Sequence, residues 1–184
     1  MTKNELKPQI VFDEFAKINE IPRPSKHEEK IIEYLKSVGE ELGLPTKVDE
    51  VGNVVISKPA TPGYEGKPTV ILQSHMDMVC ESLAGKEIDF ENDPIETYVE
   101  GEWLKADRTT LGADDGIGVA MELALLRSND VEHGPIECVF TRDEETGLPG
   151  AMGIKEGFMT GDYLINLDSE DEGQFFISCA GGIG

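Results

Sequence analysis

Apolar residues recur along the chain at two spacings, one typical of helices and one typical of strands. Two segments near the N-terminus repeat them every three or four positions, which is the spacing of one helix face. The first runs from Pro8 to Ile18 and the second follows Ser25. Ser25 and Glu28 form the capping-box pattern that begins a helix, and Gly43 with Pro45 would end it. The sequence therefore predicts two amphipathic helices at its start.

Short apolar runs in the rest of the chain predict a sheet. The predicted strands are 53–57, 69–73, 135–142, 163–167 and 174–178. A helix over 115–127 and a short helix over 150–158 lie between them, and a hairpin is expected near 98–104. Strands that alternate with helices indicate an α/β fold. We expect a mixed, mostly parallel sheet flanked by helices.

The length of the chain fits one domain. It has 184 residues, 39% of them hydrophobic, which is enough for a buried core. The chain ends at CAGGIG, directly after the last predicted strand. We interpret this end as a truncation and expect further strands of the sheet to lie downstream.

The charge of the chain excludes two classes of partner. It has 37 acidic and 16 basic residues, for a net charge of −21. Such a surface repels phosphate backbones and anionic lipids, so we expect neither nucleic acid nor a membrane as a partner. No run approaches the roughly 20 apolar residues of a membrane span, and the first residues lack the apolar core of a signal peptide. Cys80, Cys138 and Cys179 are far apart, which favours buried free thiols in a reducing cytoplasm.

Candidate chemistry gathers where the predicted strands end and where the central helix begins. The side chains concerned are one imidazole and six carboxylates: His75, Asp77, Asp114, Asp115, Glu144, Glu145 and Asp168. In open α/β sheets the ligand site lies beyond the carboxyl ends of the strands. We therefore expect these side chains to meet at one rim of the sheet.

Each of these residues also has an ordinary structural explanation. His75 could be a satisfied structural histidine, and Asp77 could be a surface turn residue. Asp114 or Asp115 could cap the helix that they open. The two glutamates could be solvated charges, and the last aspartate could begin an acidic turn. Their joint placement at strand ends favours a shared site.

A shared site of this composition predicts bound cations. Carboxylates that lie close together repel one another unless they are protonated or bound to metal. Mixed nitrogen and oxygen ligands suit zinc, manganese or cobalt better than calcium. In hydrolytic sites two such ions lie about 3.5–4 Å apart, and one carboxylate can bridge them. Asp77 could accept the second ring N–H of His75 and so fix its tautomer.

Four motifs in these regions resemble those of the M20 metallopeptidases. They are SHMD at 74–77, GADDGIG at 112–118, EETG at 144–147 and LINLDSEDEG at 164–173. The similarity runs from PRPSKHEEKI at 22–31 to SCAGG at 178–182 and is strongest to the dipeptidase subgroup of the family. It implies a zinc-peptidase-like catalytic domain. Residues 1–184 would be its N-terminal portion, without the lid or dimerisation domain and without the C-terminal catalytic segment.

The resemblance implies four metal ligands. His75 and Asp168 match ligands of a first zinc ion, and Glu145 matches a ligand of a second. Asp114 matches the aspartate that bridges both ions. In the family, the peptide bond after this aspartate is often cis.

Two further residues match catalytic positions of the family. Asp77 matches the aspartate that orients the metal-binding histidine, and Glu144 matches the general base that takes a proton from the attacking water. The implied activity is hydrolysis of dipeptides, either Xaa-His or of broad specificity. The implied full-length protein is a cytoplasmic homodimer with two divalent ions, most simply Zn²⁺, with Mn²⁺ or Co²⁺ as substitutes.

The sequence departs from the family pattern in two places. Gly116 stands where many relatives outside the dipeptidase subgroup have lysine. The last metal histidine of the family would lie beyond residue 184, and neither His27 nor His133 is in a matching motif. We therefore expect an incomplete second metal site. Two alternatives stay open: a related amidohydrolase such as a carboxypeptidase, aminoacylase or deacylase, and a non-catalytic metal-binding fragment.

Overall fold

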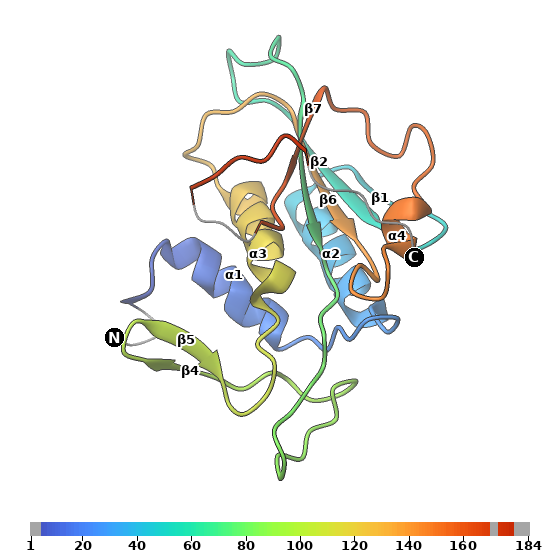
Figure 1. Ribbon diagram of the computed structural model, residues 1–184. Coiled ribbons are helices and arrows are strands. Elements are labelled where there is room, and N and C mark those ends of the chain that lie inside the picture. The colour runs from blue at the N-terminus through green and yellow to red at the C-terminus, as the bar shows by residue number, and fades with distance from the viewer. Residues whose placement is uncertain (1–4, 170–172, 179–184) are drawn as a thin grey trace.

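A five-stranded sheet lies at the centre of the computed structural model, which describes residues 5–169 and 173–178. Its strand order is β1-β2-β6-β3-β7 (Figure 1). In that order the strands are β1 (Thr46–Val48), β2 (Val54–Lys58), β6 (Ile136–Thr141), β3 (Val70–His75) and β7 (Tyr163–Asn166).

The pairing of the strands makes the sheet mixed. β6, β3 and β7 run parallel to one another, whereas β1 and β2 are antiparallel to their neighbours. His75 lies opposite Thr141, and Gln73 lies opposite Asn166. The carboxyl ends of the three parallel strands therefore meet at one edge, which confirms the predicted mixed α/β fold.

Three helices cover one face of this sheet: α1 (Gln9–Asn19), α2 (Glu29–Leu42) and α3 (Ala113–Arg127). α2 contacts β1 and β2, α3 contacts β3, and α1 packs against α3. α2 ends at Gly43, which has the left-handed φ of 64° that a helix C-terminus often requires. The core beneath the helices holds fully buried side chains from every layer, including Phe15, Ile31, Leu35, Ile56, Leu123 and Phe140.

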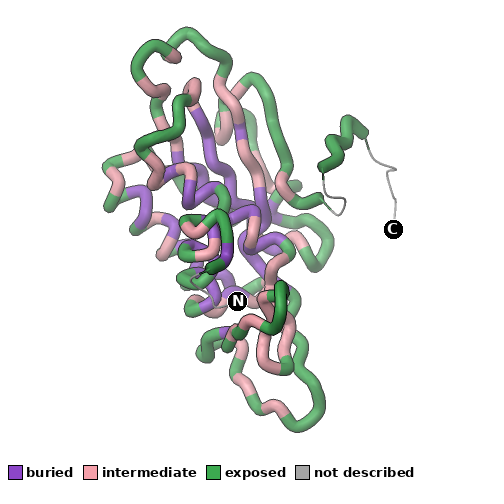
Figure 2. The backbone as a smooth tube through the Cα atoms, turned by 90° about the vertical axis from the view of Figure 1, so that its left-hand side faces the viewer, coloured by how far each residue is buried: buried purple, intermediate pink, exposed green. Residues whose placement is uncertain are grey.

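Side chains alternate between the two faces of the sheet along each strand, so apolar side chains are buried on both faces. Val54 and Ile56 of β2 point to the helices, whereas Val55 joins a smaller cluster with Ile71 and Val139 on the opposite face. Phe158 and Met159 cover that smaller cluster. Figure 2 shows the buried backbone concentrated in the sheet and in the helices packed on it.

The remaining elements lie at the periphery. β4 (Thr97–Glu100) and β5 (Trp103–Ala106) form the expected antiparallel hairpin. α4 (Pro149–Met152) is one turn long, so the helix predicted over 150–158 is much shorter than expected. Gly153 follows it, and Gly157 has a positive φ of 83°, which interrupts helical backbone there. None of the described helices has the length and apolar character that crossing a bilayer requires.

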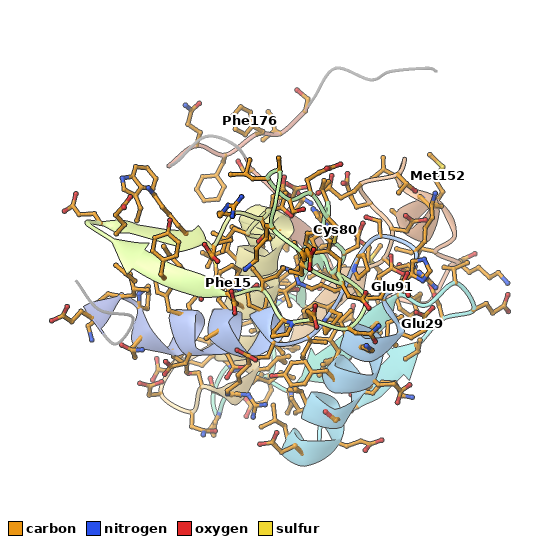
Figure 3. All side chains as sticks on the ribbon, turned by 90° about the horizontal axis from the view of Figure 1, so that it is seen from below. Phe15, Glu29, Cys80, Glu91, Met152 and Phe176 are labelled. Atoms are coloured by element: carbon orange, nitrogen blue, oxygen red, sulfur yellow. The ribbon has the colours of Figure 1, made fainter. Side chains whose placement is uncertain are left out.

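Two other predictions were wrong. Residues 174–178 form no strand: Phe175 and Ile177 are 90% and 101% exposed, and no described strand lies beside them. Phe176 lies at the outside of the molecule, far from Phe15 in the core (Figure 3). The capping box is also absent, because the Ser25 hydroxyl donates to Asp77 instead of capping α2.

The cysteines follow the expectation in part. Cys138 is a buried free thiol in β6, and Cys80 is a half-buried free thiol. Cys179 lies outside the described residues.

Candidate metal centre

The candidate residues lie together beyond the carboxyl ends of the parallel strands. His75 is the last residue of β3, and Asp168 follows the end of β7. Glu144 and Glu145 follow the end of β6, and Asp114 lies in the first turn of α3, which packs against β3. Parallel strands bring these sequence-distant positions to one edge, as open α/β sheets do for their ligand sites.

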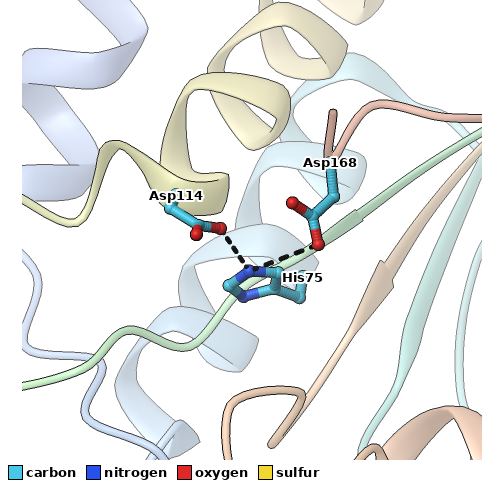
Figure 4. A group of neighbouring side chains, drawn as sticks. All are labelled: His75, Asp114 and Asp168. Atoms are coloured by element: carbon cyan, nitrogen blue, oxygen red, sulfur yellow. Dashed lines mark hydrogen bonds and ion pairs between the residues drawn. The ribbon is translucent and has the colours of Figure 1, made fainter. Parts of the chain in front are cut away.

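Three of these side chains converge on one point (Figure 4). His75 Nε2 lies 2.9 Å from Asp114 Oδ1 and 3.9 Å from Asp168 Oδ2. One ligand atom from each of the three residues lies within 4.8 Å of the others. His75 is buried, whereas both aspartates are exposed. One imidazole and two carboxylates in this arrangement fit a divalent ion that accepts nitrogen and oxygen ligands, such as zinc.

Asp77 holds the other ring nitrogen of His75. Nδ1 lies 3.3 Å from Asp77 Oδ1 and 3.2 Å from the Asp77 carbonyl oxygen. A proton on Nδ1 satisfies these acceptors and leaves Nε2 free to bind a cation. Burial opposes charge on both groups, but their hydrogen bonds dominate. With no cation at Nε2 they raise the pKa of His75 to about 9, with help from Asp114, and lower the pKa of Asp77 to about 2, so an ion that binds Nε2 would displace its proton.

Asp77 also holds the loop that carries the two glutamates. Its carboxylate is fully buried and accepts the backbone N–H groups of Glu144 at 3.0 Å and Glu145 at 3.3 Å. It also accepts the Ser25 hydroxyl at 2.7 Å. The Asp77 carboxylate therefore connects the end of β3 to the loop after β6 and to the segment that precedes α2. The possibility that it is a surface turn residue is wrong, because its side chain is inaccessible.

The two glutamates face the same group of charges. Glu144 is half-buried and Glu145 is exposed. Burial and the charge of Asp168 raise the pKa of Glu144, and burial and the charge of Asp114 raise the pKa of Glu145. Glu145 is not one of the three residues whose ligand atoms lie within 4.8 Å of one another.

The two aspartates in the first turn of α3 make different contacts. The peptide bond between Asp114 and Asp115 is cis, as the family resemblance implied. Asp114 points toward His75 (Figure 4), whereas Asp115 is buried and accepts the N–H of Gly118 at 3.2 Å, as a capping side chain does. Burial raises the pKa of Asp115 to about 7. The sequence predicted that one of the pair could cap the helix, and the structure identifies Asp115.

Arg23 is the residue of this region that sequence reasoning missed. Its side chain is buried and donates to the carbonyl oxygens of Met76 (3.3 Å), Asp77 (3.1 Å) and Gly112 (2.6 Å). It therefore joins the segment after His75 to the segment before Asp114. A lone arginine between two prolines carried no signal for this role. His27 and His133 are not in the group formed by His75, Asp114 and Asp168.

Comparison with known proteins identifies relatives along nearly the whole chain. The chain is 48% identical over 180 residues to the cytosol non-specific dipeptidase of Escherichia coli (strain K12), covering 98% of this chain and 37% of that relative. It is 30% identical over 180 residues to peptidase T of Staphylococcus carnosus (strain TM300), covering 82% of this chain and 43% of that relative. A scan against models of protein families gave no match.

A solved structure agrees with this similarity. The aminoacylhistidine dipeptidase of Vibrio alginolyticus superposes with a TM-score of 0.90 at 48% identity, covering 93% of this chain and 35% of that protein. The chain thus spans little more than a third of the dipeptidases that it matches.

Proposed function

Because the chain belongs to the M20 metallopeptidase family, we propose that residues 1–184 are the N-terminal portion of the catalytic domain of a two-metal dipeptidase. The observation that carries this proposal is the convergence of His75, Asp114 and Asp168 from three separate elements. The lid or dimerisation domain and the C-terminal catalytic segment would belong to the remainder of a longer protein.

Four residues of this chain would hold the two ions. His75 and Asp168 would bind the first ion, Glu145 would bind the second, and Asp114 would bridge them. The exposed Asp114 and Asp168 beside one buried imidazole support this assignment, since repulsion between carboxylates is relieved by a cation. The last ligand of the second ion, a histidine, would come from outside this chain. Zinc is the proposed metal, and manganese or cobalt could replace it.

The protein side chains prepare and complete the hydrolysis. When bound, the ions would polarise the scissile carbonyl and lower the pKa of a water molecule. Glu144 would take the proton of that water and pass it to the leaving amine, which suits a carboxyl whose pKa is raised. Asp77 would keep His75 in the tautomer that leaves Nε2 free, and it would hold Glu144 in place through its backbone N–H.

The proposed substrates are dipeptides, either Xaa-His or a broad range. Two relatives at 48% identity are a non-specific dipeptidase and an aminoacylhistidine dipeptidase, which supports this class over a carboxypeptidase, aminoacylase or deacylase. A cytoplasmic homodimer is the proposed form of the full-length protein. The net charge of −21 on residues 1–184 argues against nucleic acid and anionic membranes as partners.

Metal content and turnover test the proposal together. We expect Asp114→Ala to remove bound zinc more completely than Glu144→Ala, because a bridging ligand serves both ions. Glu144→Ala should keep metal but lose roughly 10²–10⁴-fold in the rate of dipeptide hydrolysis. Elemental analysis of the dialysed full-length protein measures the first effect, and amine release from dipeptides measures the second.

The control is Glu156→Ala, which removes an exposed carboxylate from the loop after α4. It should change neither quantity. Equal zinc in the parent and in Asp114→Ala would contradict the ligand assignment. Faster hydrolysis of N-acyl amino acids than of dipeptides would favour the related amidohydrolase, and zinc binding without turnover would favour a non-catalytic module.

A further inference from the structure

Glu28 has a buried carboxylate, and two of its partners, Arg142 and Asp143, lie in the loop between β6 and α4. It sits immediately before α2 and is 0% exposed. Its Oε1 accepts the N–H of Lys26 at 2.8 Å and the N–H of Asp143 at 3.1 Å. Its Oε2 accepts the guanidinium of Arg142. The carboxylate thus ties the start of α2 to the two residues that precede Glu144.

Three consecutive backbone N–H groups of this loop are bound by two buried carboxylates. Glu28 binds the N–H of Asp143, and Asp77 binds those of Glu144 and Glu145. Asp143 has a positive φ of 53°, so the chain turns sharply at the residue before the glutamate pair. The direction in which the two glutamate side chains leave the loop is therefore set from two sides.

The partners of these carboxylates explain why they can lie close together. Glu28, Asp77 and Asp143 each offer an oxygen within 4.8 Å of the others, and all three are buried. Each of them already accepts protein donors: Arg142 and backbone N–H groups at Glu28, Ser25 and backbone N–H groups at Asp77, and the hydroxyl of Thr146 at Asp143. This acidic cluster is held by hydrogen-bond donors of the loop, which indicates a mechanical role and not an ion site.

We propose that Glu28 is a positioning residue for Glu144 and Glu145. It acts through the backbone of Asp143 and through Arg142, and it touches neither substrate nor metal. The proposal rests on the proposed function for the chemistry that the two glutamates perform. When the Glu28 carboxylate is lost, Asp77 alone holds the loop that carries Glu144 and Glu145, and this loop can shift.

The test compares Glu28→Gln with Glu29→Gln in the full-length protein. Glu28→Gln keeps the size of the side chain but directs an N–H₂ group either at Arg142 or at the backbone donors, so one contact becomes repulsive. We expect kcat to fall about 10–100-fold with a change in KM below about threefold, as for other residues that orient ligands. The affinity for Co²⁺, measured by titration of its visible absorption bands, should fall about tenfold because Glu145 is displaced.

Glu29→Gln is the matched control. It removes the same charge from the neighbouring residue, which is 71% exposed and 3.9 Å from the same Arg142 guanidinium. It should alter kcat and Co²⁺ affinity by less than about twofold. If Glu28→Gln does not fold, Arg142→Gln removes the partner of Glu28 Oε2 instead. This variant should lower kcat and the affinity for Co²⁺ by a smaller factor than Glu28→Gln.

Three outcomes decide the proposal. Reduced kcat and weaker Co²⁺ binding at nearly constant KM support it. Unchanged kcat and Co²⁺ affinity in Glu28→Gln, or in Arg142→Gln where that variant replaces it, overturn it, even if the melting temperature falls. If the unmodified protein hydrolyses no dipeptide, the proposed function fails, and the Co²⁺ titration alone then decides whether Glu28 positions the loop.

Discussion

At the scale of single residues, the buried guanidinium of Arg23 beside the candidate metal centre explains the glycine at position 116. Burial lowers the pKa of Arg23 to about 10, and its guanidinium donates to three carbonyl oxygens. A Cβ atom on Gly116 would lie 2.6 Å from Arg23 Nη2 and 3.2 Å from Phe15. Position 116 therefore requires glycine in this chain, because Arg23 fills the space that a side chain would need.

This crowding predicts the effect of adding one methyl group. Gly116→Ala should lower the free energy of unfolding by about 1–3 kcal/mol, because the buried guanidinium must move away from its carbonyl acceptors. Urea denaturation measures the change. Gly66→Ala is the control, since nothing lies within 4 Å of its Cβ position, and it should change stability by less than about 0.5 kcal/mol. Equal effects of the two substitutions would contradict the packing argument.

At the scale of elements, helix α3 packs against neighbours on two sides, and its buried Glu122 side chain contacts the sheet. α3 lies between α1 and β3. Glu122 is 0% exposed, its Oε1 accepts the N–H of Val139 at 3.2 Å, and its Oε2 contacts the Ser74 hydroxyl. Burial raises the pKa of Glu122 well above 4.5. Glu122 thus accepts hydrogen bonds from the Ser74 hydroxyl and from the Val139 N–H, and in its neutral form it avoids the cost of a buried charge.

The raised pKa of Glu122 predicts how stability changes with pH. Since the pKa is higher in the folded than in the unfolded state, the contribution is full below about pH 4.5 and is lost as the pH rises through the folded pKa. Glu122→Gln keeps a neutral donor and acceptor at any pH. We expect the variant to gain stability relative to the parent between pH 5 and pH 9 in urea denaturation. The exposed Glu102→Gln should show no such trend, and a difference that is constant with pH would refute the role of Glu122.

The elements also show what the sequence could and could not predict. Helix α2 followed from apolar periodicity and strands β2, β3 and β6 from short apolar runs, because each buries apolar side chains against a neighbouring layer; β7 also followed from its apolar run, although its side chains are exposed in this chain. Residues 174–178 have the same apolar character but form no strand, since a strand requires a neighbour as well as a composition. The strand ends correctly predicted that the side chains of His75 and Asp168 lie close together at one edge of the sheet. The role of Glu28 was hidden, because a capping box and a carboxylate that reaches a distant loop have the same local sequence.

At the scale of the whole molecule, acidic charge is concentrated where a cation is proposed to bind. The chain has a net charge of −21, and burial, together with repulsion from Asp168 and Asp114, raises the pKa values of Glu144 and Glu145. This repulsion opposes folding without a counter-charge. A bound divalent ion would relieve it, so metal binding and stability should be linked.

Metal removal therefore predicts a change in thermal stability. At a free zinc concentration about 100 times the Kd, binding would stabilise the folded state by about 2.7 kcal/mol. For a chain of this size this corresponds to a rise of roughly 5–10 °C in Tm, reversed by a chelator. Differential scanning calorimetry measures the shift. Asp114→Ala should show little or none of it, and an equal shift in that variant would place the stabilising ion elsewhere.

The position of β7 at the rim of the sheet has a consequence for how long an ion would stay. Within the described part of the chain, β7 pairs with β3 alone, and its side chains are exposed along its whole length. Asp168 follows directly from this strand, whereas His75 belongs to a strand held on both sides. Segments with few buried contacts open locally before the core does. In residues 1–184 taken alone, Asp168 would therefore be the ligand that leaves the ion first, and a strand from the rest of the longer protein that paired with β7 would slow this exchange.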